Sequence, residues 1–118
     1  MIRERLVWQK VVSNELYLIN EIEFKVGKNV IGTISITELK WKKATRGHSH
    51  NTQTEIYLFL SGSGIIRIGK NYKIVEGSKK SINYIPKGEY HQVFNTSDEE
   101  KLVFMTLCKG KVQRPCFT

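Results

Sequence analysis

Apolar and polar residues alternate in short runs along most of the chain, and this period of two predicts β-strands. In Val30–Leu39 the side chains of Ile34 and Ile36 face one side, and small hydroxyl residues face the other. No window keeps the 3.6-residue period of a helix for long enough to form one. Glu15–Phe24 fits either one strand or two. Further strands are predicted at Thr54–Leu60, Ile65–Ile68, Tyr72–Val75, Ser81–Ile85, Tyr90–Asn95 and Lys101–Leu107.

Turn-forming residues separate these runs at short intervals. The sequence SGSG at 61–64 predicts the turn of a hairpin, and Pro86-Lys87-Gly88 predicts a second reversal of the chain. Many short strands with such turns are typical of a β-sandwich or barrel. Because 118 residues correspond to one domain, we expect a single all-β domain with little or no helix.

One predicted strand is apolar on both faces. In Thr54–Leu60 the residues Ile56 and Leu58 share one side, while Tyr57 and Phe59 share the other. A sheet exposed to water on one side does not need a second apolar face. Either a second sheet or another subunit covers it, and we therefore expect a homodimer.

The net charge of the chain indicates which kinds of molecule it can bind. The chain carries 19 basic and 11 acidic residues, a formal net charge of +8. A basic surface favours anionic partners such as phosphorylated metabolites or nucleic acid, although solubility alone also explains it. No RNA-recognition, KH or zinc-finger motif is present. The expected partner is a small anionic molecule or a sugar, without specific nucleic-acid binding.

The sequence also bears on the cellular compartment. No apolar run approaches the ~20 residues that span a bilayer, and the first residues lack the apolar stretch of a signal peptide. Cys108 and Cys116 form neither a CxxC motif nor a zinc-binding spacing, so free thiols are expected. We expect a cytoplasmic protein that is not attached to a membrane.

Three histidines are the main candidates for chemistry. His48 and His50 are two positions apart, so on an extended segment their rings point to one side and can converge on a metal ion. Glu55 follows five residues later, and a turn can bring it beside them. His91 comes directly after the Pro86–Gly88 turn. The alternative is that these histidines are ordinary polar residues near turns.

The surrounding residues resemble the two motifs of the cupin superfamily. Residues 48–62 read HxHx4Ex6G, and residues 86–95 read PxGxxHxxxN. The cupin motif has a glycine six positions before its first histidine, where this chain has Lys42. The resemblance implies a double-stranded β-helix, or jelly-roll barrel, over residues 30–107. Residues 1–29 then form N-terminal strands, and residues 108–118 form a C-terminal tail.

The resemblance also implies a metal site. Its ligands would be His48, His50, Glu55 and His91, a set that suits Mn, Fe, Zn, Ni or Cu and leaves coordination positions open for water or substrate. Gly88 would allow the tight turn that directs His91 inward. For Asn95 the two interpretations are packing behind His91 and a structural role at the strand end.

Part of the first motif is similar to the cupin-type phosphoglucose isomerases of archaea. The similarity lies in the run from Thr45 to His50, in the Glu-Ile-Tyr at 55–57 and in the glycine turn. It implies that Thr45 and Gly47 hold a substrate phosphate and that Tyr57 lies at the sugar. Thr33 is a weaker candidate for a phosphate contact, and Arg46 is either a phosphate contact or a surface charge.

The resemblance thus favours a metal-dependent aldose–ketose isomerase acting on a sugar phosphate. Glu55 would be the base that moves the proton, with Tyr57 as the second candidate. Cupin folds host many activities, so two alternatives stay open. One is a metal-dependent oxygenase, and the other is a module that binds a sugar or another small ligand without catalysis.

Overall fold

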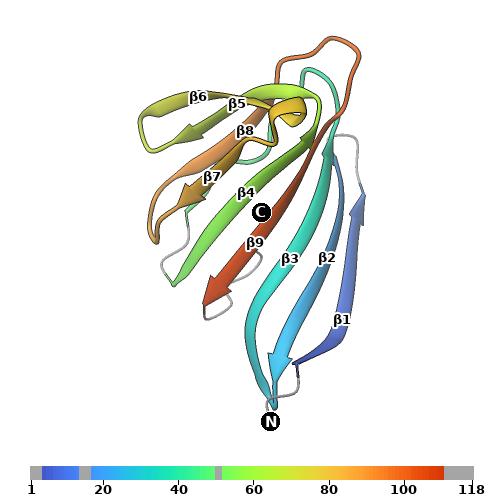
Figure 1. Ribbon diagram of the computed structural model, residues 1–118, viewed down its shortest axis with the longest axis vertical. Helices are drawn as coiled ribbons and strands as arrows, with labels where there is room; N and C mark the ends of the chain where they lie inside the picture. Colours follow the sequence, from blue (N-terminus) through green and yellow to red (C-terminus); the bar gives the residue numbers. More distant parts are fainter. Residues whose placement is uncertain (1–3, 14–16, 50–51, 111–118) are drawn as a thin grey trace.

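The computed structural model describes residues 4–13, 17–49 and 52–110, and these residues fold almost entirely into β-strands. Six strands form one antiparallel sheet in the order β1-β2-β3-β9-β4-β7, and three form a second in the order β6-β5-β8 (Figure 1). The strands are β1 (Glu4–Ser13), β2 (Tyr17–Val26), β3 (Asn29–Leu39), β4 (Gln53–Ser61), β5 (Ser63–Ile68), β6 (Asn71–Glu76), β7 (Ile82–Ile85), β8 (His91–Asn95) and β9 (Leu102–Gly110).

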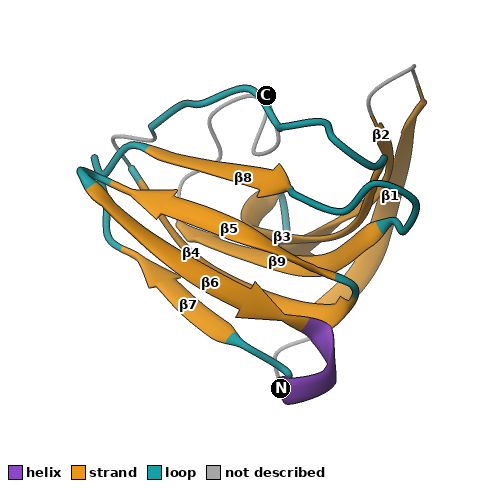
Figure 2. Ribbon diagram, turned by 90° about the horizontal axis from the view of Figure 1, so that it is seen from above, coloured by secondary structure: helices purple, strands orange, loops and turns teal. Residues whose placement is uncertain are grey.

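The two sheets pack against each other through an apolar core. The rings of Phe59 and Phe104 of the large sheet contact each other with centroids 5.3 Å apart, and they belong to the same buried cluster as Ile66 and Val93 of the small sheet. The small sheet lies over the β9-β4-β7 half of the large sheet, while β1 and β2 extend beyond it (Figure 2). This arrangement confirms the predicted all-β jelly-roll fold. A three-residue 3₁₀ turn, Gly77–Lys79, is the one helical element among the described residues.

The predicted strand boundaries agree with the structure to within three residues. The described part of the stretch left open as one strand or two, residues 17–24, lies within a single strand, β2, which pairs with β1 on one side and with β3 on the other. A register shift between Phe24 and Lys25 marks the end of regular pairing with β3. No helix in the described part of the chain has the length and apolar character needed to cross a bilayer.

The inner face of the large sheet carries buried polar residues beside its apolar core. On β3 the hydroxyl residues Thr33, Ser35 and Thr37 are buried, whereas Ile36 on the opposite face is 40% exposed. Likewise, Glu55 and Tyr57 on β4 point inward. The alternation in the sequence correctly divides the side chains of β3 between two opposite faces. The face that carries the apolar residue Ile36 is the outer one.

The outer face of the large sheet carries a continuous apolar surface. Ile56 lies opposite Leu107 on β9 and Tyr84 on β7, and each of these three side chains is more than a third exposed. Ile36 and Ile82 extend the surface on β3 and β7. The small sheet packs on the other side, so the second sheet is not what covers this face.

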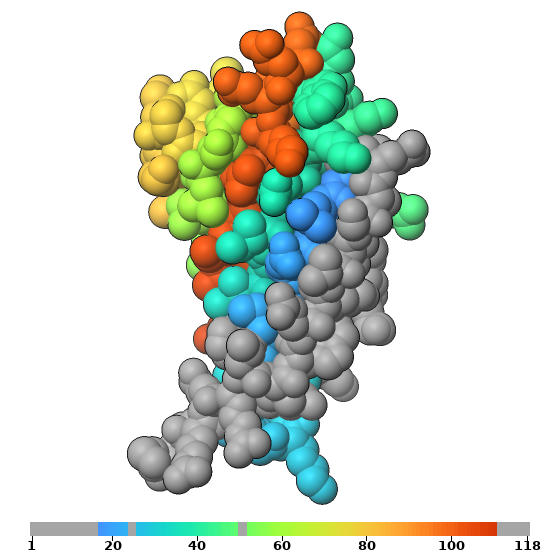
Figure 3. All heavy atoms as spheres, turned by 90° about the vertical axis from the view of Figure 1, so that its right-hand side faces the viewer, coloured from blue at the N-terminus to red at the C-terminus, as the bar shows by residue number. Residues whose placement is uncertain are grey.

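The loop before β9 is fixed to the end of β3 by Asn95. Its Nδ2 donates hydrogen bonds to the carbonyl oxygens of Leu39 (3.0 Å) and Glu100 (2.8 Å), and its Oδ1 accepts one from the Ser97 amide. The segment after β3 and this loop lie side by side at the top of Figure 3, joined by the amide of Lys42 donating to the Ser97 carbonyl. Asn95 thus has the structural role considered above.

Candidate metal centre

Backbone pairing next to the small sheet positions the first histidine. Residues 43–48 run beside β8: the Thr45 amide donates to the Val93 carbonyl, and the Asn95 amide donates to the Lys43 carbonyl. At the end of this segment His48 and His91 form an antiparallel bridge with N–O distances of 3.1 and 2.9 Å. Their rings meet edge to face, with centroids 4.4 Å apart. Backbone pairing therefore brings the rings of His48 and His91 into contact, although the two residues are 43 positions apart in sequence.

Both imidazoles are oriented in the same way by their Nδ1 atoms. Nδ1 of His48 lies 3.0 Å from the carbonyl oxygen of Arg46, and Nδ1 of His91 lies 3.0 Å from that of Glu89. A carbonyl oxygen only accepts, so each Nδ1 carries the proton, and in the neutral ring Nε2 keeps its lone pair. This is the tautomer that a histidine adopts when Nε2 binds a metal and Nδ1–H is held by a backbone carbonyl.

Glu55 completes a group of three metal-ligand residues. It lies on β4 opposite Cys108 of β9 and Ile85 of β7, and it is 1% exposed. Its Oε2 lies 2.5 Å from Nε2 of His91, and its Oε1 lies 3.0 Å from Sγ of Cys108. Potential ligand atoms of His48, Glu55 and His91 all lie within 4.8 Å of one another.

This group fits a divalent transition metal. Two imidazole nitrogens and a carboxylate oxygen are a donor set that suits the metals expected above. His50, the fourth predicted ligand, lies outside the described residues, so three of the four predicted ligands are brought together.

The electrostatics of the site follow from burial and from Glu55. Burial lowers the pKa of His91, but the hydrogen bond and the negative charge of Glu55, together with the Glu89 carbonyl, outweigh it, and the net shift of the His91 pKa is upward. Burial raises the pKa of Tyr57 well above its ordinary value, and the charge of Glu55 raises it further, against a hydrogen bond with Thr106. The Tyr57 hydroxyl therefore stays protonated at neutral pH.

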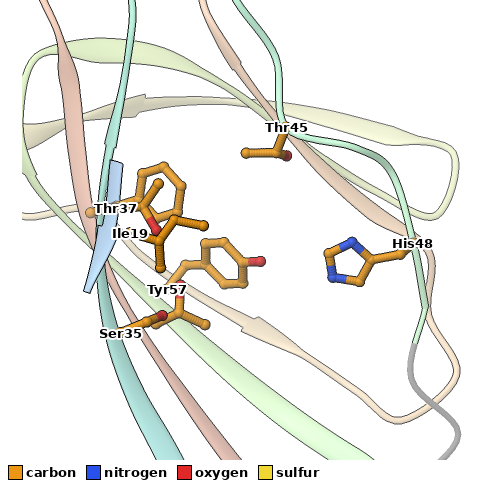
Figure 4. Close-up of a pocket in the computed structure, with 8 residues that line it drawn as sticks. Ile19, Ser35, Thr37, Thr45, His48 and Tyr57 are labelled. Atoms are coloured by element: carbon orange, nitrogen blue, oxygen red, sulfur yellow. The ribbon is translucent and has the colours of Figure 1, made fainter. Parts of the chain in front are cut away.

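A cavity lies between Tyr57 and His48. Figure 4 shows the Tyr57 ring crossing the interior with its hydroxyl directed toward the His48 side, and Thr45 above the space between them. Its volume is about 20 Å³, which is room for little more than one water molecule. The cavity is therefore narrow. The lining residues are Ile19, Ser35, Thr37, Thr45, His48, Tyr57, Phe104 and Thr106.

The predicted phosphate contacts have different environments. Thr45 lines the cavity, and its Oγ1 accepts a hydrogen bond from the Val93 amide, which leaves its own proton available to a ligand. Gly47 does not line the cavity; it packs against the Tyr90 hydroxyl, which occupies the position that a Cβ would take. The Arg46 side chain is exposed. Thr33 is buried on β3 but does not line this cavity.

Two features were not anticipated from the sequence. Cys108 is disulfide-bonded in the structure, so the expectation of a free thiol at this position is wrong. The interior also contains buried polar residues that motif analysis did not single out, among them Glu21, Ser35, Asn83 and Thr106. The alternation of hydroxyl and apolar residues in β3 was the available signal, but it did not reveal which face is buried.

Comparison with known proteins supports the fold. No protein-family model and no curated protein sequence matches the chain. Among solved structures, the capsular polysaccharide assembling protein CapF from Staphylococcus aureus superposes with a TM-score of 0.73 and 20% identity, over 92% of this chain and 30% of CapF. The chain thus spans about a third of the CapF polypeptide.

Smaller proteins superpose over most of their length. A predicted oxalate decarboxylase from Thermotoga maritima gives a TM-score of 0.65 with 16% identity, over 93% of this chain and 98% of that protein. A cupin protein from Bacteroides fragilis gives a TM-score of 0.62 with 24% identity, over 75% of this chain and 73% of that protein. At these identities the likeness concerns the fold, and we conclude that the chain has the cupin fold, with a group of two histidines and a glutamate that could hold a metal ion.

Proposed function

We propose that the protein is a metal-dependent aldose–ketose isomerase that acts on an open-chain sugar phosphate. The observation that carries the proposal is the position of the His48–Glu55–His91 group beside a cavity that Tyr57 and Thr45 also line. The net charge of +8 favours an anionic substrate.

The reaction needs the carbonyl and the neighbouring hydroxyl of the sugar to be polarised. A divalent metal held by His48, Glu55 and His91 would supply that Lewis acidity. Glu55 is the proposed base, which takes a proton from one carbon and returns it to the next. Tyr57 is better suited to donate a hydrogen bond to the substrate oxygen, because its raised pKa keeps the hydroxyl protonated.

The phosphate end of the substrate would lie toward the segment before β4. The Thr45 hydroxyl can donate to a phosphate oxygen, since its Oγ1 already accepts from the Val93 amide. The amide of Gly47 and the exposed guanidinium of Arg46 lie on the same segment and are the further candidates. The likeness to CapF, described as assembling capsular polysaccharide, agrees with a carbohydrate-related substrate.

A second candidate is a metal-dependent oxygenase. The described ligands are two histidines and one carboxylate, the combination that holds Fe(II) with open positions in non-haem oxygenases. The same ligand group therefore serves either chemistry, and the metal and the co-substrate distinguish them. A third outcome, metal binding without turnover, is expected of a module that binds a sugar or another small ligand without catalysis.

The test is an activity assay on protein loaded in turn with Mn²⁺, Fe²⁺, Zn²⁺ and Ni²⁺. The proposal predicts interconversion of glucose 6-phosphate and fructose 6-phosphate, and a fall in kcat of at least about tenfold in Tyr57→Phe with unchanged metal content. Substrate-dependent O₂ uptake by the iron form would support the oxygenase instead. Bound metal with no turnover of any sugar phosphate in a broad panel would contradict the isomerase.

A further inference from the structure

Aromatic side chains gather on the outer face of the small sheet. Tyr72 on β6 is 60% exposed, and Tyr90, directly before β8, is 37% exposed. The ring of Tyr72 lies 6.4 Å from that of Phe94 on β8, centroid to centroid. The opposite face of the small sheet packs on the large sheet (Figure 2), so these rings are not part of the core. An exposed apolar surface of this kind is typical of a binding site.

Arg67 lies at the centre of this face and is held in place by its neighbours. On β5 it is opposite Tyr72 on one side and Gln92 on the other. Its guanidinium carbon lies 5.6 Å from the centroid of the Tyr72 ring and 4.9 Å from that of the Tyr90 ring. Its Nε donates a hydrogen bond to the Gly69 carbonyl oxygen (2.8 Å). One hydrogen bond and two ring contacts therefore orient this partly exposed side chain.

The terminal nitrogens of Arg67 are available to a ligand. Within the described part of the chain they take part in no hydrogen bond or ion pair, whereas Nε is already bonded. A guanidinium has five N–H donors in a planar fork, and the fork binds a phosphate or carboxylate through two parallel hydrogen bonds. Because the Arg67 side chain is already oriented, it loses less conformational entropy when such a group binds.

The surroundings of Arg67 favour an anionic partner. Lys70 in the β5–β6 turn and Lys73 on β6 are both exposed. Of the acidic residues nearby, Glu89 packs against the β5–β6 turn, and Glu76 at the end of β6 forms an ion pair with a lysine of the following turn. Three cations thus lie around one carboxylate that has no ion pair within the described residues, and the local charge is positive.

We propose that the outer face of the small sheet binds single-stranded nucleic acid, with a phosphate on Arg67 and a base stacked on Tyr72. A nucleotide combines the two groups that match this face, a flat aromatic ring and a negative charge beside it. A chain of carboxylates would use Arg67 but would leave the exposed rings without a partner. Stacking accepts any base, so the binding needs no sequence-reading motif. This function goes beyond the proposed isomerase and needs no metal.

Fluorescence anisotropy of the full chain in EDTA and low salt tests the proposal. The probes are a labelled thymidylate dodecamer, its uridylate counterpart and a dodecamer without bases. We expect at least one base-containing probe to bind about tenfold more tightly than the abasic one. Tyr72→Ala should remove this difference, whereas the matched control Tyr72→Phe keeps the ring and should retain it.

The dependence of binding on salt tests the contact of Arg67 with phosphate. Each phosphate contact contributes about 0.7 to the slope of the logarithm of affinity against the logarithm of salt concentration for a single strand. Arg67→Gln should reduce the magnitude of the slope by about this amount. The control Lys28→Gln lies at the exposed β2–β3 turn, at the opposite end of the molecule (Figure 1), and should leave the slope unchanged.

The outcomes decide between stacking and other kinds of binding. If all three probes bind equally, or if folded Tyr72→Ala binds the thymidylate and uridylate probes as wild type does, the attraction is electrostatic only and the proposal is wrong. It is also wrong if no probe binds, or if vesicles of anionic lipid bind in a Tyr72-dependent way and the oligonucleotides do not. Tighter binding of the thymidylate or of the uridylate probe supports the proposal and identifies DNA or RNA as the partner.

Discussion

His48 and His91 lie opposite each other as a backbone-paired couple, with ring centroids 4.4 Å apart and each Nδ1 held by the carbonyl oxygen two residues earlier. Potential ligand atoms of the two rings and of the Glu55 carboxylate lie within 4.8 Å of one another. Because the backbone and not the side chains sets this geometry, we expect the site to be organised before a metal binds.

The response of the site to pH follows from the raised pKa of His91. Protonated His91 pairs with Glu55, whereas metal binding needs the neutral ring, so protons and metal compete. The metal-free protein gains stability from this pair below the ordinary histidine pKa of about 6.5, and it loses that stability as the pH rises through the raised pKa. The metal-loaded protein should show the opposite trend.

Thermal unfolding with and without Zn²⁺ from pH 5.5 to 8.5 measures this competition. The difference in Tm between the loaded and the metal-free protein should widen as the pH rises across the raised pKa. A difference that stays constant over the whole range would show that His91 does not take part in metal binding.

Lys42 offers a test of backbone strain. Its φ is +58°, in the left-handed region, at the position where the cupin motif has glycine. A Cβ in this conformation costs ~1–2 kcal/mol, partly offset by the larger unfolded-state entropy of glycine. We expect Lys42→Gly to raise the free energy of unfolding in urea by about 0.5–1 kcal/mol.

Lys42→Ala is the matched control, because it keeps the Cβ and removes only the exposed ion pair with Asp98. It should leave stability unchanged or slightly lower it. Equal stabilisation by alanine and glycine would show that the side chain, and not the backbone conformation, is responsible.

The apolar outer face of the large sheet predicts a homodimer. Ile56 lies near its centre, with Leu107 and Tyr84 beside it. Light scattering should give about twice the 13.7 kDa of one chain, and Ile56→Lys should yield monomers because it buries a charge in the interface. Ile74→Lys is the control, since Ile74 is 77% exposed on the other sheet. A monomeric wild type, or a dimer that tolerates Ile56→Lys, would contradict this interface.

The sequence predicts the strands well because each alternating run is bounded by a strong turn. Gly88 illustrates this: its φ of +79° is the left-handed conformation that the Pro86–Gly88 turn requires just before His91. The motif spacing likewise identifies three candidate metal ligands, His48, Glu55 and His91, that the fold brings together. What the sequence does not reveal is which face of β3 is interior, since hydroxyl residues are buried there and Ile36 is exposed. On this strand the usual rule that apolar side chains are buried and polar ones exposed is reversed. The buried Glu21 departs from the same rule, and motif analysis therefore does not identify it.

The central claim is that His48, Glu55 and His91 hold one metal ion. Its most direct test is the metal content, by mass spectrometry, of wild type and the double variant His48→Ala/His91→Ala, each exposed to Zn²⁺ and then desalted. Glu99→Gln, at an exposed carboxylate of the β8–β9 loop, is the control. We predict about one equivalent of Zn²⁺ per chain in wild type and Glu99→Gln and almost none in the folded double variant. Full metal content in the double variant would contradict the account.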